Sequence, residues 1–284
     1  MRLPDSELVA LDRKHVWRPY TSSEDHEQRP LFVVERAEGP WLISPSGKRV
    51  LDASGSWWCN NLGHGHPRLQ RALRAQADKL MHCTFAGVTH EPAAKLAAEL
   101  TALAPDGLSR VFFSDNGSTA VEVALKMAFQ YWQQNGRPER KRFLSLPSAY
   151  HGDTLGAMSV ASVDEFNAVF RPLMFEAERP EEPLGDDWSP VFETLFERLR
   201  NEGDEIAGVI VEPIVQGAAG MRMYRPEFLA ALRDETRRAD TFLIADEVFT
   251  GFGRSGPMWA CEHAGIAPDL LCTAKGLSLS LIHI

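Results

Sequence analysis

The stretch TFLIADEVFTGFGRSGPMWACEHAGIAPDLLCTAKG at Thr241–Gly276 decides the fold. Within it, the apolar run Phe242–Ala245 ends in Asp246 and Glu247, and a second run at Leu270–Ala274 ends in Lys275. Short apolar runs that end in polar residues are typical of buried parallel strands, which deliver side chains to a cleft at their carboxyl ends. The stretch therefore predicts two strands of a parallel sheet, each carrying an ionisable group at the same edge.

The two groups also suggest a chemistry. A lysine that can form a Schiff base, held near a carboxylate able to keep a pyridine nitrogen protonated, is what pyridoxal phosphate chemistry requires. Lys275 and Asp246 have these properties, so the pattern indicates an aminotransferase.

The rest of the chain alternates between helical and strand patterns from His66 onward. Alternation of this kind predicts an α/β fold with a mostly parallel sheet sandwiched by helices. Further strands are expected at Arg110–Phe113, Phe143–Leu146, Val209–Glu212, Phe242–Asp246 and Leu270–Thr273. Helices are expected at Pro67–Leu80, Glu91–Leu103, Ser118–Gln133, Pro190–Asn201 and Pro226–Arg238.

The N-terminal residues differ from this pattern. Short strand-like runs at Leu31–Arg36, Pro40–Ile43 and Arg49–Asp52 are separated by Gly-Pro and Ser-Gly turn signals, so they predict a small sheet apart from the main core. We therefore expect an N-terminal segment over residues 1–62, contributing to a small domain, and a large cofactor-binding α/β domain over 63–284.

Composition narrows the class of protein. The 284 residues are 44% hydrophobic and carry a formal net charge of −9, which argues against nucleic acid as a partner because that binding requires a basic surface. No apolar run predicts a secretory leader or a membrane anchor, so a cytoplasmic location is expected. The four cysteines show no paired metal-ligand spacing and predict reduced thiols rather than a zinc site or a disulfide framework. They are Cys59, Cys83, Cys261 and Cys272.

A candidate phosphate site lies in Ser114–Thr119, between a predicted strand and a predicted helix. Helix N-termini collect unpaired backbone N–H groups and the positive end of the dipole, and Gly117 would let the backbone approach an anion closely. The alternative is an ordinary helix cap formed by Asn116 or Ser118.

Other candidate residues follow predicted strands or lie in irregular chain. Tyr150 could stack on a planar heterocycle or be a core aromatic, and His151 taken alone is more often structural. Glu212 could contact and support the residues that bind the ligand, or it could be a solvated acid at a strand end. Tyr20 and Trp57 could line a ligand pocket or pack as core.

Seven segments taken together carry a family resemblance. In order along the chain they are HVWRPYTS at His15–Ser22, GSWWCNNLGHGHP at Gly55–Pro67, DNGSTAVEVALKMA at Asp115–Ala128, YHGDTLGAMSV at Tyr150–Val160, VIVEPIVQGAAGMRMY at Val209–Tyr224, LIADEVFTGFGR at Leu243–Arg254 and AKG at Ala274–Gly276. The set resembles the class III aminotransferases of pyridoxal-phosphate-dependent fold type I, over nearly the whole chain.

The resemblance implies a role for each matched residue. Lys275 would hold pyridoxal 5'-phosphate and then move the proton between substrate and cofactor, while Asp246 would pair with the pyridine nitrogen. Gly117 and Ser118 would bind the phosphate. Tyr150 would stack on the ring and border the substrate. The substrate pocket would be lined by Trp57 and Tyr20, where aromatic faces also suit a sulfonium cation.

Within the family, the first and second segments and Gln216-Gly217-Ala218 are most similar to members of biotin biosynthesis. That similarity implies a homodimer in which S-adenosylmethionine, or lysine in some relatives, donates an amino group to 8-amino-7-oxononanoate by ping-pong kinetics. Two alternatives remain open. One is a class III enzyme of the ornithine or β-alanine type, and the other is an inactive fragment.

The chain departs from the family after Lys275, at Leu277–Ile284. Members usually continue well beyond this point with most of the small domain, a Thr that reaches the partner subunit's phosphate and an Arg that receives the substrate carboxylate. The resemblance therefore predicts that the C-terminal small domain is missing and that these 284 residues alone are inactive.

Overall fold

The computed structural model describes residues 2–162 and 167–278, so most of the tail at Leu277–Ile284 lies outside the described residues. The chain forms two compact units, Met1–Cys83 and Thr84–Ile284. This division falls later than the predicted boundary after residue 62, and the assignment of cofactor binding to 63–284 remains a prediction. Within the described ranges, no helix is long and apolar enough to cross a membrane.

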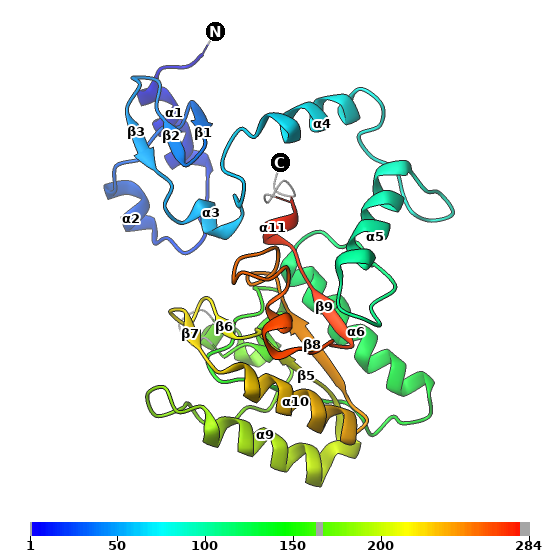
Figure 1. Ribbon diagram of the computed structural model, residues 1–284. Helices are drawn as coiled ribbons and strands as arrows, with labels where there is room; N and C mark the ends of the chain where they lie inside the picture. The colour runs from blue at the N-terminus through cyan, green and yellow to red at the C-terminus, as the bar shows by residue number, and fades with distance from the viewer. Residues whose placement is uncertain (1, 163–166, 279–284) are drawn as a thin grey trace. The chain divides into compact units, whose positions relative to one another are not determined.

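The first unit contains the predicted small antiparallel sheet, in the order β1 (Arg36–Glu38), β2 (Trp41–Ile43) and β3 (Arg49–Leu51) (Figure 1). The prediction of a strand at Leu31–Arg36 is wrong for most of its length. Arg36 pairs with Ile43, after which the chain turns back at Ser44–Gly47, so the residues before Glu35 have no neighbouring strand in the described sheet. The helices of this unit are α1 (Asp5–His15), α2 (Ser23–Gln28), α3 (Gly55–Trp58) and α4 (Pro67–Ala77).

The second unit is built on a four-stranded parallel sheet, which confirms the predicted fold class. Its order is β4-β5-β8-β9, and all three neighbouring pairs are parallel. The strands span Arg142–Ser145 (β4), Ile206–Val211 (β5), Phe242–Asp246 (β8) and Leu270–Cys272 (β9), close to the predicted ranges. Because the strands are parallel, their carboxyl ends lie at one edge.

Helices cover both faces of this sheet (Figure 1). Strand side chains alternate between two cores, as the two-residue period of a strand requires. Leu144, Val209 and Leu243 pack on the side of α9 (Ser189–Glu202) and α10 (Pro226–Arg238). Phe143, Ile210 and Ile244 pack on the side of α6 (Gly117–Gln134) and α7 (Leu155–Val160). One face of α6 is buried and carries Val121, Leu125, Ala128 and Trp132.

The remaining elements of the second unit are short except for one helix. They are α5 (Glu91–Leu103), η1 (Ala168–Leu173), η2 (Gly203–Glu205), β6 (Val215–Gln216), β7 (Arg222–Met223), η3 (Ala260–Ala264) and α11 (Lys275–Ser278).

The predicted strand at Arg110–Phe113 is wrong, because these residues form no ladder in the described structure. A cavity of about 510 Å³ borders this segment, α5, α6 and β9. Phe112 is 63% exposed, and β9 is the outermost strand of the described sheet on this side. The pattern predicted an extended conformation but not whether a hydrogen-bonding neighbour would lie beside it.

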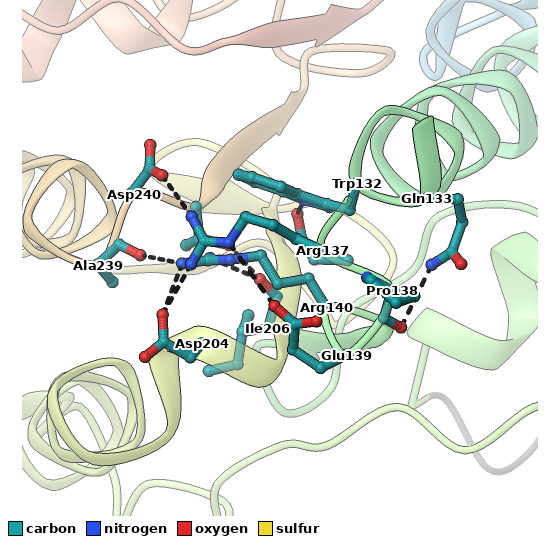
Figure 2. A network of polar contacts seen from close by, with 12 residues as sticks. Trp132, Gln133, Arg137, Pro138, Glu139, Arg140, Asp204, Ile206, Ala239 and Asp240 are labelled. Atoms are coloured by element: carbon teal, nitrogen blue, oxygen red, sulfur yellow. Dashed lines mark hydrogen bonds and ion pairs between the residues drawn. The ribbon is translucent and has the colours of Figure 1, made fainter. Parts of the chain in front are cut away.

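The amino edge of the sheet is held by a buried arginine (Figure 2). Arg140 is 1% exposed and donates hydrogen bonds to the carbonyls of Ile206 and Ala239 at 3.2 and 2.9 Å. Its guanidinium lies 4.5 Å from the ring centroid of Trp132. Burial, together with the nearby Arg137 cation, lowers the pKa of Arg140. This network joins the starts of β4 and β5 to the end of α10, opposite the edge where polar strand ends gather.

Candidate active site

Asp246 and Lys275 leave neighbouring strands at the same edge of the sheet, as the sequence predicted. Asp246 is paired in register with Cys272, the last residue of β9, and the N–H of Glu247 donates to the Cys272 carbonyl at 2.8 Å. Three residues later, the half-buried Lys275 begins α11. The topology therefore places the carboxylate at the end of β8 and the amine that follows β9 at the same edge of the sheet.

Asp246 is fixed by contacts to both of its carboxylate oxygens. Nδ1 of His151 lies 2.7 Å from Oδ2, and the Val248 N–H donates to Oδ1 at 3.1 Å. Asp246 and His151 are 4% and 3% exposed. Among the described residues, His151 Nε2 has no hydrogen-bond partner although it is buried. The carboxylate of Asp246 is thus oriented and desolvated, and Nε2 of its partner His151 has no acceptor or donor among the described residues.

Tyr150 lies beside this pair, in the loop that follows β4. The ring is half-buried, and its hydroxyl donates to Asp153 Oδ2 at 2.9 Å. Its backbone N–H donates to Glu212 Oε1 at 3.0 Å. The side chain is therefore not a fully buried core aromatic, and its backbone is fixed to the next strand.

Glu212 is buried rather than solvated, which decides between the two interpretations of this residue. It is 5% exposed at the end of β5, and burial raises the pKa of its carboxyl to about 7, with the nearby Asp246 adding to the rise and His151 opposing it. Glu212 is therefore not a solvated acid at a strand end, and its burial favours the interpretation in which it supports the site.

The N-terminus of α6 reaches the same edge. Asn116 is the helix cap, because its side chain accepts the Thr119 N–H at 3.0 Å, whereas Ser118 Oγ lies 2.8 Å from Thr154 Oγ1. The capping alternative thus holds for Asn116, and Gly117 and Ser118 form the first turn of the helix. A Cβ on Gly117 would lie 2.6 Å from the Val248 side chain, so only glycine permits this approach.

These elements offer the three groups that a phosphorylated pyridine aldehyde requires. The first turn of α6 presents backbone N–H groups and the positive end of an 18-residue helix to a phosphate. The oriented carboxylate of Asp246 suits a protonated ring nitrogen, and Lys275 supplies a primary amine. The residues present therefore fit pyridoxal phosphate.

Glu247 has a different task from its neighbour. It is 0% exposed and accepts the N–H groups of Ala260 and Cys261 at 3.0 and 2.9 Å, so burial raises its pKa while it holds η3 in place. Successive strand side chains point to opposite faces, which separates the two carboxylates that the sequence places side by side.

Tyr20 and Trp57 belong to the first unit, where they contact each other. Their ring centroids are 5.7 Å apart, and the residues are 54% and 60% exposed, so neither is a core aromatic of that unit. Both have a left-handed backbone, with φ of 51° and 59°, which is unfavourable for bulky residues. The pocket role predicted for them remains a prediction.

Sequence inspection alone missed two contacts at this site. One is the pairing of His151 with Asp246, and the other is the packing of Val248 against Gly117. A histidine in the short loop after a strand, at the edge that also carries Asp246, was the available signal for the first.

Comparison with known proteins identifies the family. Residues 22–282 match the family model "Aminotransferase class-III". The chain is 50% identical over 271 residues to the adenosylmethionine-8-amino-7-oxononanoate aminotransferase of Synechococcus elongatus, covering 93% of this chain and 63% of the relative. It is 45% identical over 290 residues to the protein of the same name from Geobacter sulfurreducens, covering 97% and 64%. The chain thus spans less than two thirds of the length of these curated relatives.

Solved structures give the same result. The adenosylmethionine-8-amino-7-oxononanoate aminotransferase of Methanocaldococcus jannaschii superposes with a TM-score of 0.93 at 35% identity, covering 98% of this chain and 64% of that one. An amine transaminase from an uncultivated Pseudomonas species, solved with PLP bound, superposes with a TM-score of 0.83 at 35% identity, covering 94% and 63%. The chain described here belongs to the class III aminotransferase family.

Proposed function

We propose that this chain forms the cofactor-binding part of a transaminase that transfers the amino group of S-adenosylmethionine to 8-amino-7-oxononanoate, giving 7,8-diaminononanoate in biotin biosynthesis. The observation that carries the chemistry is the buried His151–Asp246 pair, at the same strand edge as Lys275. The substrates are supported by relatives at 45% and 50% identity whose name contains both compounds.

The cofactor of this family is pyridoxal 5'-phosphate, which when bound supplies an electron sink for the bond that loses a proton. Asp246 would hold the proton on the ring nitrogen, and His151 would orient Asp246 for this role. The backbone N–H groups at Gly117 and Ser118 would bind the phosphate.

Three more residues act on the substrate side. Lys275 would anchor the cofactor through its Nζ atom and then move a proton at the substrate carbon. Tyr150 would stack on the ring and border the substrate. Tyr20 and Trp57 line the substrate pocket, where their faces favour a sulfonium cation.

We further propose a homodimer in the cytoplasm that acts on small molecules and on neither nucleic acid nor membranes. The formal net charge of −9 supports the exclusion of nucleic acid.

The test is to add pyridoxal phosphate and S-adenosylmethionine to the purified transaminase that contains this chain and follow its visible absorbance, with ornithine and β-alanine as competing donors. Diaminononanoate is then measured by mass spectrometry after the keto substrate is added. The proposal expects S-adenosylmethionine to be the preferred donor. A faster reaction with ornithine or β-alanine would favour the other class III activity, and cofactor binding without amino transfer would favour an inactive fragment.

A further inference from the structure

Glu212 occupies the junction of two loops at the candidate site. Its Oε1 accepts the Tyr150 N–H at 3.0 Å, and its Oε2 accepts the Gly217 N–H at 2.9 Å. Its backbone carbonyl accepts the Tyr224 hydroxyl at 2.7 Å. One buried carboxylate therefore joins the loop after β4 to the loop that contains Gly217, and each oxygen serves a different loop.

Both loops also reach the segment that carries Asp246. The first continues from Tyr150 to His151, which contacts Asp246 at 2.7 Å. In the second, a Cβ on Gly217 would lie 2.9 Å from the ring of Phe249, three residues beyond Asp246. A shift of the Glu212 carboxylate would thus change the position of Tyr150 and, through His151, the orientation of Asp246.

We propose that Glu212 is a positioning residue, and that its ionised carboxylate holds the Tyr150–His151 loop in place against Asp246. The inference rests on the proposed function only in taking Tyr150 and Asp246 as cofactor contacts. The tether itself is a property of the protein without cofactor.

The N–H groups of Tyr150 and Gly217 each face one oxygen of Glu212, so both oxygens must act as acceptors. A protonated carboxyl has an O–H that itself needs an acceptor, so one of the two bonds is weakened when Glu212 takes up a proton. A glutamine has a single acceptor oxygen, and its NH₂ group would face an N–H without bonding. The ionisable groups that face this carboxylate are His151 on the loop after β4, Asp246 on β8 and Tyr224 after β7. Burial, strengthened by Asp246, places the pKa of Glu212 at about 7, so both forms are accessible near neutral pH.

Glu247 provides a matched control. It is also a buried glutamate at a strand end that accepts two backbone N–H groups, but these belong to Ala260 and Cys261 in η3. Loss of a buried acceptor should therefore affect both variants similarly in global stability. Only the Glu212 variant should affect the Tyr150 loop.

The experiment compares Glu212→Gln with Glu247→Gln in the 284-residue chain by amide hydrogen exchange, without cofactor. Loss of a hydrogen bond to a charged group predicts about tenfold faster exchange or more at Tyr150 and Gly217 in Glu212→Gln. In Glu247→Gln, faster exchange is expected at Ala260 and Cys261 instead. Unchanged exchange at Tyr150 in Glu212→Gln, or equal acceleration at Tyr150 in both variants, would overturn the proposal.

A second measurement uses the unmodified chain and covers the case in which Glu212→Gln does not fold. After correction for intrinsic rates, protection of the Tyr150 and Gly217 amides should fall between pH 8 and pH 6, while protection of the buried β5 amide of Val209 should not fall. Constant protection at Tyr150 would contradict a role for the ionised form.

Cofactor binding forms a separate arm of the test. Glu212→Gln should weaken pyridoxal phosphate binding by about tenfold while Glu247→Gln changes it less than about twofold. If the unmodified chain binds no pyridoxal phosphate, the proposed function fails, and the exchange results still decide whether Glu212 tethers the loop. If exchange changes at Tyr150 but cofactor affinity does not, the tether exists without positioning the site, and the proposal is wrong.

Discussion

Nδ1 of His151 lies 2.7 Å from Oδ2 of Asp246, although 95 positions separate the two residues along the chain. The contact joins the loop after β4 to the end of β8, two strands that are separated in the sheet by β5. Because the Val248 N–H holds the other carboxylate oxygen, Asp246 cannot rotate without breaking one of these bonds. The site thus has a carboxylate whose direction is set before any cofactor binds, which is the preorganisation that electrostatic catalysis needs.

The charge of Asp246 can be removed while one of its two acceptor contacts is kept. Asp246→Asn retains an oxygen that accepts from His151, so the protein should still fold and bind pyridoxal phosphate. Its reaction with S-adenosylmethionine should slow by on the order of a thousandfold, because the ring nitrogen loses its charged partner. Rapid mixing with the amino donor, followed by visible absorbance, measures this rate. A near-normal rate would identify Asp246 as a structural acid at a strand end.

Lys275 should be the residue that borohydride links covalently to pyridoxal phosphate. Its position at the start of α11, three residues beyond the partner of Asp246, motivates this expectation. Lys275→Ala should abolish both the visible absorbance and the label in a tryptic digest. Lys126→Ala, at an exposed position on α6, is the control and should retain both. Labelling of another lysine in the unmodified chain would refute the assignment.

The sequence predicted the sheet well because its strands are buried on both faces. β8 and α10 begin and end at the predicted residues, and β4, β5 and β9 lie within a few residues of the predicted ranges. Apolar runs and helical periodicity are local properties, so they can be recognised without knowledge of neighbours. Arg110–Phe113 also has a local strand pattern, but a strand exists only if another segment pairs with it, and the described structure contains none beside it.

The sequence predicted which residues of the candidate site lie at strand ends, but not which side chains contact one another. Asp246 and Lys275 could be placed at one edge because parallel strands share it. Whether Glu212 is buried depends on the loops that fold over it, and the different tasks of Asp246 and Glu247 depend on which face each side chain takes. These features come from tertiary packing, which a local sequence pattern does not report.

The aromatic pair in the first unit gives a prediction about substrate rather than cofactor. Tyr20 and Trp57 are more than half exposed, so Trp57→Ala should cost little stability. If the pair lines the substrate pocket, the substitution should raise KM for S-adenosylmethionine or 8-amino-7-oxononanoate and leave the cofactor absorbance unchanged. Trp17→Ala replaces a 96% exposed tryptophan of the same unit and serves as the control. Equal KM values in the two variants would contradict the pocket role.

Arg140 should contribute to stability and not to the site. Arg140→Met keeps the aliphatic stem but leaves the carbonyls of Ile206 and Ala239 without their donor, so the free energy of unfolding should fall by about 3 kcal/mol. Arg137→Met removes ion pairs to the exposed Asp204 and Asp240 and should cost less than about 1 kcal/mol. Denaturant unfolding measures both values. Pyridoxal phosphate affinity should be unchanged, since the network lies at the opposite edge of the sheet, and a large loss of affinity in Arg140→Met would argue against this separation.

Glu212 gives a pH dependence whose sign can be worked out. Burial raises its pKa from 4.5 to about 7 in the folded chain, so between these values the folded state binds more protons than the unfolded state. The stability contributed by this group is therefore fully present below about pH 4.5 and is lost as pH rises through 7, by on the order of 3 kcal/mol.

Other carboxyls act in the opposite direction, so a variant is needed to isolate this effect. A hydrogen bond from Arg142 lowers the pKa of Glu178, and the stability it contributes is lost as pH falls. Glu212→Gln is uncharged at every pH and leaves Glu178 unchanged. The free energy of unfolding of the unmodified chain, minus that of Glu212→Gln, should therefore be larger at pH 5 than at pH 8. Parallel stability curves would show that Glu212 has an ordinary pKa.

The same proton should have opposite effects on global stability and on the loop. Protonation removes the cost of a buried charge, so it favours the folded chain, but it weakens one of the two bonds from Tyr150 and Gly217. A merely structural glutamate would show amide protection at Tyr150 that follows global stability. A positioning glutamate should show protection at Tyr150 that falls as the stability contributed by Glu212 rises. The reason is that the hydrogen bonds from Tyr150 and Gly217 require the charged carboxylate, whereas burial favours the protonated form.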